Sequence, residues 1–247
     1  MIKAAFSAGK ILKKYYGRKL NIKDKAGKGL VSQADKEAEN KILSILLRKF
    51  NFNVIAEESD YPDNNSEYCW VIDPIDGTTN YLHQIPFFCI SIALYKDDKP
   101  EAAVIYQPLS KELFYAEHGK GVCINGKKLG KLNTNTPAII DCNLGYSDES
   151  ARLFLEALNG ILPQYHNIRN LGSSALELAY LAASRLDCFL SYGDELYDVA
   201  AGILMAQESG CLVTNWEGIP WNIKDKSLLV APPELHGKIR KIFVSDF

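Results

Sequence analysis

The apolar residues at the start of the chain recur at the spacing of a helix. Their pattern ends at Gly17, so we expect an amphipathic helix before that residue. Its apolar face comprises Ala4, Ala5, Ala8, Ile11, Leu12 and Tyr15. A polar, Gly/Lys-rich stretch at 21–31 follows and predicts a loop or a mobile hairpin. Helical spacing returns from Ser32, and the apolar side of this second helix comprises Ala34, Ala38, Ile42, Ile45 and Leu46.

Short apolar runs separated by polar breaks come next, a pattern that is typical of a sheet. The runs lie at 53–56, 69–72, 87–95, 102–108 and 112–119. Asn125-Gly126 is a strong signal for a hairpin turn. The first half of the chain is therefore predicted to be two helices followed by a largely antiparallel sheet.

Near residues 133–150 the pattern changes, and strands alternate with helices from there on. We expect strands at 138–144, 165–168, 187–191, 211–214 and 227–231, and helices at 149–159, 173–184, 198–209 and from 234. Such alternation implies helices packed on a sheet. The change predicts an N-terminal α+β lobe at 1–145 and a C-terminal α/β lobe at 146–247. Since active sites often lie between lobes, the chemistry should draw on both.

The composition is that of an ordinary globular protein, with 47% hydrophobic and 23% charged residues among 247. The formal net charge of −2 provides no basic field, so we expect no nucleic-acid partner. No apolar run reaches the roughly 18 residues of a membrane span, and lysines interrupt the first helix, which argues against a secretory signal. We expect no membrane partner, although a helix lying on a membrane surface is the alternative for the first helix.

The six cysteines form no CxxC pair, and most lie in apolar, strand-like runs. Zinc sites need clustered spacing, which this sequence lacks. Buried, reduced thiols explain the pattern best, and they favour a cytoplasmic protein.

Two aspartates follow a buried strand and are the first candidates for chemistry. The run 69–72 delivers Asp73 at a strand end, Pro74 turns the chain away, and Asp76 projects three residues later. Converging carboxylates repel each other, and both ionise only beside a strong positive charge. A divalent cation such as Mg²⁺ meets that need with oxygen ligands. The alternative is a plain turn, since Asp-Gly and Asp-Pro are also turn signals.

Polar groups next to these aspartates add to the site. Thr78, Thr79 and Asn80 supply amides and hydroxyls where a phosphate could dock. Glu57-Glu58 follows another short strand, and the two strand ends could meet in one sheet. A solvated loop is the alternative for this glutamate pair.

Two long segments stand out, WVIDPIDGTTNYLHQIPFFCISIAL at 70–94 and LYDVAAGILMAQESG at 196–210. They resemble the two signatures of the inositol monophosphatase family. AEES at 56–59 stands before them in the family order. The resemblance covers nearly the whole chain and implies a layered αβαβα sandwich, of the α+β or α/β kind, like inositol monophosphatase and fructose-1,6-bisphosphatase. It also implies a Mg²⁺-dependent, lithium-sensitive phosphomonoesterase and a homodimer.

The family's metal ligands carry over onto matching positions. The resemblance implies two or three Mg²⁺ ions per site. Glu57, Asp73 and the carbonyl of Ile75 look like ligands of the first. Asp73, Asp76 and Asp198 look like ligands of the second, and a third, weaker ion would be bound near Glu57 largely through water. Metal-activated water then needs no side-chain nucleophile.

The substrate positions carry over in the same way. Gly77 and Thr78 match residues that cradle the phosphate, and Asp76 also belongs to the substrate site. Thr78 and Asp35 resemble the pair that orients the attacking water, so the implied catalytic residues are Thr78, Asp35 and Glu57. The loop at 169–175, with Gly172, Ser173 and Ser174, resembles the segment that contacts the alcohol. Helix capping by Ser173 is a second reading of this loop. His83 is expected to be structural.

The chain departs from the family pattern at a few positions. Ala56 replaces a usual glycine and Tyr197 a usual tryptophan. Ser191 stands where inositol-specific enzymes carry a hydroxyl-binding glutamate, while Asp194 and Glu195 lie further along the loop. The substrate is therefore a small phosphorylated metabolite, most simply resembling inositol-1-phosphate. Alternatives are the reactions of fructose-1,6-bisphosphatase, histidinol-phosphatase or 3′-phosphoadenosine phosphatase, or a regulatory, partner-binding role with incidental catalysis.

Overall fold

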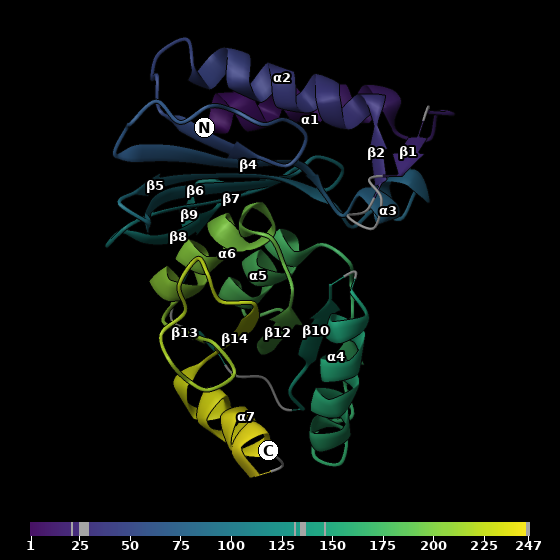
Figure 1. Cartoon of the computed structure of the whole chain (residues 1–247), viewed down its shortest axis with the longest axis vertical. Coiled ribbons are helices and arrows are strands. Elements are labelled where there is room, and N and C mark those ends of the chain that lie inside the picture. The colour runs from purple at the N-terminus through teal and green to yellow at the C-terminus, as the bar shows by residue number, and fades with distance from the viewer. Residues whose placement is uncertain (21, 25–29, 131, 134–136, 146, 246–247) are drawn as a thin grey trace.

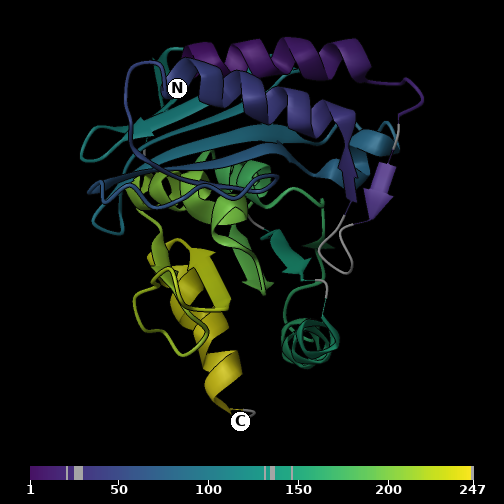
Figure 2. The same cartoon turned by 45° about the horizontal axis from the view of Figure 1, so that its top comes forward.

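Two amphipathic helices form the first layer of the molecule. The computed structural model describes residues 1–20, 22–24, 30–130, 132–133, 137–145 and 147–245. Helix α1 (Ile2–Tyr15) and helix α2 (Gln33–Leu46) lie side by side across one face of a large sheet (Figures 1 and 2). Both bury the alanine-rich stripe that the sequence predicts. Between them, β1 (Ile22–Asp24) pairs antiparallel with β2 (Leu30–Ser32), so the predicted hairpin is confirmed, and its tip lies outside the described residues.

The second layer is a seven-stranded sheet in chain order, β3 to β9. Its strands are β3 (Asn53–Ala56), β4 (Tyr68–Asp76), β5 (Cys89–Lys96), β6 (Lys99–Gln107), β7 (Glu112–Glu117), β8 (Gly121–Ile124) and β9 (Lys127–Lys128). Only the β3–β4 pair among these strands is parallel. Asn125 and Gly126 have φ angles of 48° and 83° and make the predicted turn between β8 and β9.

Two helices fill the space between this sheet and a second one. Helices α5 (Ser174–Ala182) and α6 (Leu196–Ser209) pack on the large sheet through small residues such as Ala179 and Ala201. On their opposite faces, Leu178 and Ile203 pack on the second sheet in a cluster with its residue Phe189. Because these helices are buried on both sides, they are apolar almost all round.

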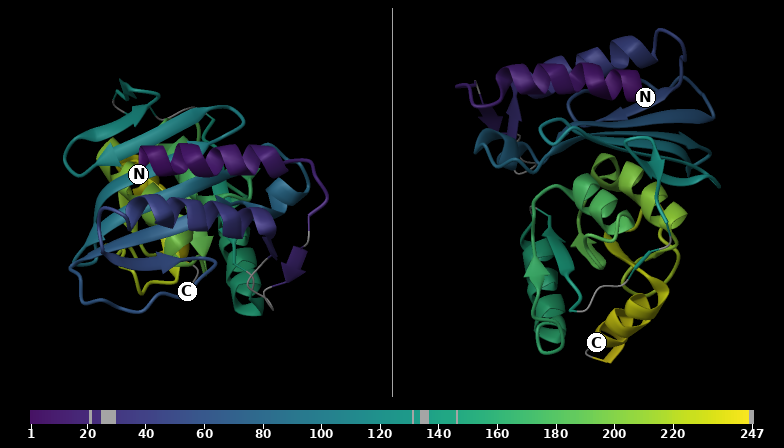
Figure 3. Two further views of the ribbon diagram at one scale, coloured as in Figure 1. Left: turned by 90° about the horizontal axis from the view of Figure 1, so that it is seen from above. Right: turned by 180° about the vertical axis from the view of Figure 1, so that it is seen from behind.

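The second sheet has five strands in the order β11-β10-β12-β14-β13. The strands are β10 (Ile140–Leu144), β11 (Ile168–Arg169), β12 (Cys188–Tyr192), β13 (Leu212–Thr214) and β14 (Ser227–Ala231). Helices α4 (Asp148–Ile161) and α7 (Pro233–Ser245) cover its outer face. The right-hand view in Figure 3 places α1 and α7 at opposite ends of the molecule. The predicted αβαβα sandwich is confirmed.

Most predicted elements coincide with observed ones to within a few residues. The exception is the strand expected at 165–168, where β11 consists of Ile168 and Arg169 alone. The chain passes from the first sheet to the second between Lys128 and Ile140. A division into lobes near 145 stays a prediction. All six cysteines are free. In the described ranges, no helix has the length and apolar character to cross a bilayer.

The contact between α5 and α6 gives a stability prediction. A Cβ at Gly202 on α6 would lie 2.4 Å from Leu178 Cβ on α5. Gly202→Ala should therefore lower the free energy of unfolding by about 1–3 kcal/mol through overpacking. A Cβ at Gly237 on α7 would contact nothing within 4 Å, so Gly237→Ala should raise it by about 0.5–1 kcal/mol. Urea denaturation measures both, and equal effects would contradict the packing argument.

Candidate active site

Strand β4 ends in an irregular turn that presents two carboxylates. Its pairing with β5 is interrupted between Asp73 and Asp76. Asp73 Oδ1 accepts a hydrogen bond of 2.8 Å from the Ile75 amide, which holds the turn on itself. Both aspartates are buried. The sequence therefore places the two acids at a buried strand end, as predicted.

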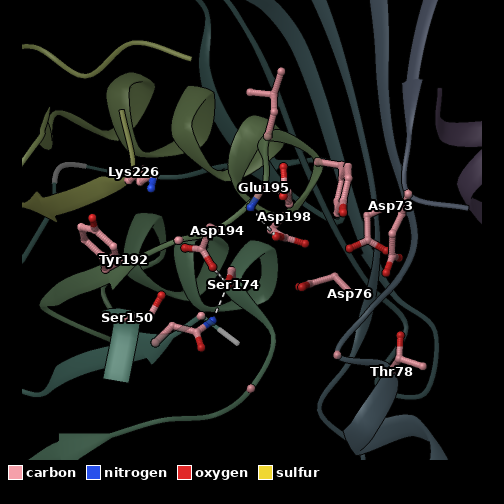
Figure 4. Close-up of a pocket in the computed structure, with 18 of the residues that line it drawn as sticks. Asp73, Asp76, Thr78, Ser150, Ser174, Tyr192, Asp194, Glu195, Asp198 and Lys226 are labelled. Atoms are coloured by element: carbon pink, nitrogen blue, oxygen red, sulfur yellow. Dashed lines mark hydrogen bonds between the residues drawn. The ribbon is translucent and has the colours of Figure 1, made fainter. Parts of the chain in front are cut away.

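Asp198 lies close to Asp73 and Asp76, although it comes from helix α6, which packs on the large sheet. It lies in the first turn of α6, where its Oδ2 accepts a hydrogen bond of 2.8 Å from the Glu195 amide. Asp73, Asp76 and Asp198 each offer an oxygen, and the three oxygens lie within 4.8 Å of one another. Figure 4 shows them facing one another across the cleft. Their grouping joins the first and second signatures in space.

Burial and mutual repulsion disfavour the charged forms of these acids. Burial raises the pKa of Asp73 well above its ordinary value, and neighbouring carboxylates, Glu57 first, raise it further. Burial also raises the pKa of Asp198, with Asp194 and Asp76 adding to the effect. A divalent cation reverses this balance because it pairs with all the charges at once. The oxygen-only donor set therefore fits a hard metal ion.

Helix α5 holds Asp76 by one of its two oxygens. Asp76 Oδ2 accepts hydrogen bonds from the Ala175 amide at 2.9 Å and from the Ser173 hydroxyl. The Cys89 thiol donates to the same oxygen at 3.5 Å. Burial raises the pKa of Asp76 to about 6, and these donors offset part of the rise. Ser173 makes no side-chain cap to its own helix, so its hydroxyl serves the aspartate instead.

Gly77 joins the turn of β4 to the short helix α3 (Thr78–Leu82). It has a φ of 89°, and a Cβ there would lie 3.0 Å from the Gly172 carbonyl oxygen. A side chain would therefore push away the loop that leads into α5. Asn80 fastens that loop, since its Nδ2 donates to the Leu171 carbonyl at 2.7 Å.

Helix α2 aims Asp35 at Thr78. Asp35 is fully buried, and its Oδ2 accepts hydrogen bonds from the Ser32 amide at 2.8 Å and hydroxyl at 2.6 Å in a capping box. Its Oδ1 accepts a long bond of 3.4 Å from the Thr78 hydroxyl, which also donates to the Ile75 carbonyl at 2.9 Å. The predicted water-orienting pair thus lies together beside the turn.

The sequence analysis missed three residues that hold the site in place. Glu39, one helical turn after Asp35, accepts from the Glu58 amide at 2.9 Å and so anchors the predicted Glu57 loop. Glu177 accepts from the Leu171 amide at 2.9 Å and anchors the loop at 169–175. Cys89 contacts Asp76. Glu39 falls on the apolar face of its helix, a signal that could have identified it.

Glu177 forms a buried acid pair with Asp141 on β10. Both side chains are fully buried, and Glu177 Oε2 and both Asp141 carboxylate oxygens lack an ordinary donor among the described residues. Burial raises the pKa of Asp141 to about 7 and raises that of Glu177 as well. A proton shared between the two carboxyls satisfies both groups.

One cleft of about 920 Å³ gathers most of the predicted residues. Asp35 and Ser173 lie behind its wall, and His83 is exposed directly after α3. The predicted residues that line it are Glu57, Asp73, Ile75, Asp76, Gly77, Thr78, Gly172, Ser174 and Asp198. Its far end carries Ser150, Tyr192, Asp194 and Lys226 (Figure 4), and Asn143 also lines the cleft.

Comparison with known proteins shows similarity along the whole chain. The profile of the inositol monophosphatase family matches residues 1–246. A Nus factor SuhB from Xylella fastidiosa is 37% identical, covering 88% of this chain and 81% of its own. An inositol-1-monophosphatase from Mesorhizobium japonicum is 35% identical, covering 88% and 85%. A fructose-1,6-bisphosphatase/inositol-1-monophosphatase from Thermotoga maritima is 31% identical, covering 98% and 93%.

Solved structures agree with the sequence relatives. The extragenic suppressor protein SuhB of Bartonella henselae superimposes with a TM-score of 0.94 at 34% identity, covering 100% of this chain and 98% of its own. A Thermotoga maritima IMPase superimposes with a TM-score of 0.88 at 30% identity, covering 99% and 95%.

Asp198→Asn should affect the stability of the metal-free protein and its stabilisation by metal in opposite directions. Removing one of the repelling charges should raise the melting temperature of the metal-free protein. It should also abolish the rise that Mg²⁺ or Mn²⁺ gives the wild type, because a ligand is lost. Thermal denaturation with chelator and with each ion measures both effects. A metal-induced rise equal to that of the wild type would remove Asp198 from the metal site.

The Asp141–Glu177 pair predicts a dependence of stability on pH. A carboxyl whose pKa rises from 3.8 to about 7 on folding stabilises the protein below its unfolded pKa, and this contribution is lost as pH rises through 7. In Asp141→Asn, an amide donates to Glu177 without titrating. The melting temperature of the variant minus that of the wild type should be at least about 2 °C larger at pH 8.5 than at pH 5. Melting curves in metal-free buffer at the two pH values test this, and a pH-independent difference would contradict it.

Proposed function

This chain belongs to the inositol monophosphatase family, and from that membership we propose that it is a Mg²⁺-dependent phosphomonoesterase. Its substrate would be a small phosphorylated metabolite, most simply an alcohol ester resembling inositol-1-phosphate. The observation that carries the proposal is the meeting of Asp73 and Asp76 with Asp198, next to Gly77 and Thr78. These residues come from two layers and leave an open cleft beside them, as hydrolysis of a bound phosphate ester requires.

Each residue of the site has a part in this proposal. Glu57, Asp73, Asp76, Asp198 and the Ile75 carbonyl would hold two or three Mg²⁺ ions. Bound metal would supply Lewis acidity and lower the pKa of water from about 16 toward 7. Amides of Gly77 and Thr78 would donate to the phosphate. Fixed donors of this kind are most effective in a buried site, because they need no rearrangement during the reaction.

Thr78 and Asp35 would orient the attacking water. The Thr78 hydroxyl is the group beside the aspartates, and Asp35 stands behind it with one oxygen fixed by Ser32. The other oxygen, Oδ1, accepts from the Thr78 hydroxyl and could take up the proton that water passes to that hydroxyl. No serine or cysteine nucleophile is required. Cys89 is the thiol that lies against Asp76, and it is buried, so it would support the aspartate rather than react.

The alternatives differ in substrate or in class. Fructose-1,6-bisphosphatase activity is favoured by the dual name of the Thermotoga maritima relative. The reactions of histidinol-phosphatase and 3′-phosphoadenosine phosphatase use the same fold. A regulatory, partner-binding role is the second candidate, since several relatives carry the name Nus factor SuhB. The retention of every predicted metal ligand favours the enzyme. A cytoplasmic homodimer without nucleic-acid or membrane partners stays a prediction.

Phosphate release from inositol, sugar and nucleotide phosphates, with and without Mg²⁺, tests the proposal. We expect Mg²⁺-dependent turnover that Li⁺ inhibits. Asp76→Asn should lower kcat/KM by at least about 100-fold, as loss of one contact to the reacting group does in other enzymes. Asp97→Asn is the matched control, because Asp97 is exposed in the β5–β6 hairpin with a φ of 46° that asparagine adopts readily. A folded wild-type protein that releases no phosphate from any ester would refute the enzyme.

A further inference from the structure

Asp141 lies at a position of the second sheet where the pattern of the strand calls for an apolar side chain. Its neighbours Ile140 and Cys142 face the outer helices α4 and α7, so Asp141 faces the side that α5 and α6 cover. Phe189, paired with Asp141 in the register of β10 and β12, packs on that side in an apolar cluster. A buried acid costs folding free energy, and residues that break the pattern of a fold are expected to serve its function.

Glu177 on α5 is the partner of Asp141, and it also holds the loop at 169–175. Its Oε1 accepts hydrogen bonds from the Leu171 amide at 2.9 Å and from the Ser173 amide at 3.3 Å. Its Oε2 and both Asp141 oxygens are buried, and no hydroxyl, amide or cation of the described residues donates to them. Two ionised carboxylates would repel each other here, so a proton between them is what allows both to stay buried.

No cation in the part of the chain that the structure describes takes the place of this proton. Arg169, opposite Asp141 in the register of β10 and β11, is exposed, and its Nη1 donates to the Ile168 carbonyl. Burial raises the pKa of Asp141 to about 7, and the charge of Arg169 offsets only part of that rise. Burial raises the pKa of Glu177 as well. The two carboxyls therefore share a proton at neutral pH, and a hydrogen bond joins them.

The loop that Glu177 holds connects this pair to the metal site. Glu177 accepts from the Ser173 amide, while the Ser173 hydroxyl donates to Asp76 Oδ2. The Ala175 amide donates to the same Asp76 oxygen at 2.9 Å. A displacement of Glu177 would therefore move two of the donors that fix Asp76. One short segment thus carries the geometry of the buried acids to a metal-binding carboxylate.

We propose that Asp141 and Glu177 are positioning residues for Asp76. The hydrogen bond between the two carboxyls keeps Glu177 on the loop amides, and the loop keeps its donors on Asp76. The proposal rests on the proposed function and adds two residues that act on the reaction from outside the cleft. Neither Asp141 nor Glu177 lines that cleft, so each acts through the loop rather than through substrate.

Asp141→Asn and Asp141→Val form a matched pair of variants. Asparagine supplies an amide donor to Glu177 from the same place, whereas valine suits a buried strand but supplies none. We expect Asp141→Val to lower kcat/KM about 10-fold, and to raise by about 10-fold the Mn²⁺ concentration that gives half of the metal-induced rise in melting temperature. Losses of this order follow the removal of a support behind a metal ligand. Asp141→Asn should keep both values within about 3-fold.

The substrates separate this role from a contact with the alcohol. Inositol-1-phosphate and p-nitrophenyl phosphate, which has no alcohol hydroxyl, should lose the same factor in Asp141→Val, because Asp76 serves the phosphate that both contain. Cys142→Val is the control, since Cys142 is the next residue of β10 and faces the outer helices. It should change neither the kinetics nor the Mn²⁺ response.

Glu177→Gln and Glu177→Met repeat the comparison from the other side of the pair. Glutamine still accepts from the loop amides and donates to Asp141, whereas methionine has a similar length and accepts no strong hydrogen bond. Glu177→Met should show the losses of Asp141→Val, and Glu177→Gln should stay within about 3-fold of the wild type. Melting curves with chelator verify that each variant is folded, and this second pair decides the matter if Asp141→Val is not.

Three results would overturn the proposal. They are equal losses in the amide and the apolar variants, unchanged kinetics and Mn²⁺ response in the apolar variants, and a loss confined to inositol-1-phosphate. Wild-type protein that cleaves neither ester refutes the proposed function instead. The Mn²⁺ response of the variants is measured without substrate, so it tests the positioning of Asp76 in that case too.

Discussion

The mutual repulsion of Asp73, Asp76 and Asp198 is the constraint around which the site is built. Burial raises the pKa of each carboxyl, and neighbouring acids add to the effect at Asp73 and Asp198. The fold opposes this repulsion with fixed donors: a capping amide holds Asp198, and an α5 amide and two side chains hold Asp76. One oxygen of each residue accepts a hydrogen bond from a fixed donor, so the three carboxylates keep their places around a point that could hold a cation. Rigid supports of this kind determine how closely a metal site keeps its geometry.

The buried helices α5 and α6 hold the residues of the site in place relative to both sheets. Their apolar surfaces pack between two sheets, so the N-terminus of α5 is fixed relative to β4. Glu177 then ties the loop at 169–175 to its own helix, and Asp141 supplies a second acid behind it. The loop at 169–175 is therefore as firmly held as the turn that carries Asp73 and Asp76.

Periodicity alone predicted the elements well, since α1 and α2 are helices half buried on one stripe and β5 to β7 are ordinary antiparallel strands. It gave no indication that β3 lies parallel to β4, because pairing direction depends on connections rather than on composition. The metal acids were recognisable from two long motifs. Glu39 lies outside both motifs, and only its place on the apolar face of α2 indicated a role. Glu177 and Asp141 gave no such signal, because their pairing and burial arise from tertiary packing.

The close approach of Gly77 to the Gly172 carbonyl also has a consequence for biosynthesis. The two residues are 95 positions apart (172 − 77), so a ribosome adding about 5–20 residues per second needs about 5–20 s to make the second after the first. During that interval the nascent chain carries Asp73 and Asp76 without Asp198 or the α5 amides. The complete metal centre exists only once the chain has been made past α6. The site can therefore be assembled only late in synthesis, and products truncated before α6 would lack it.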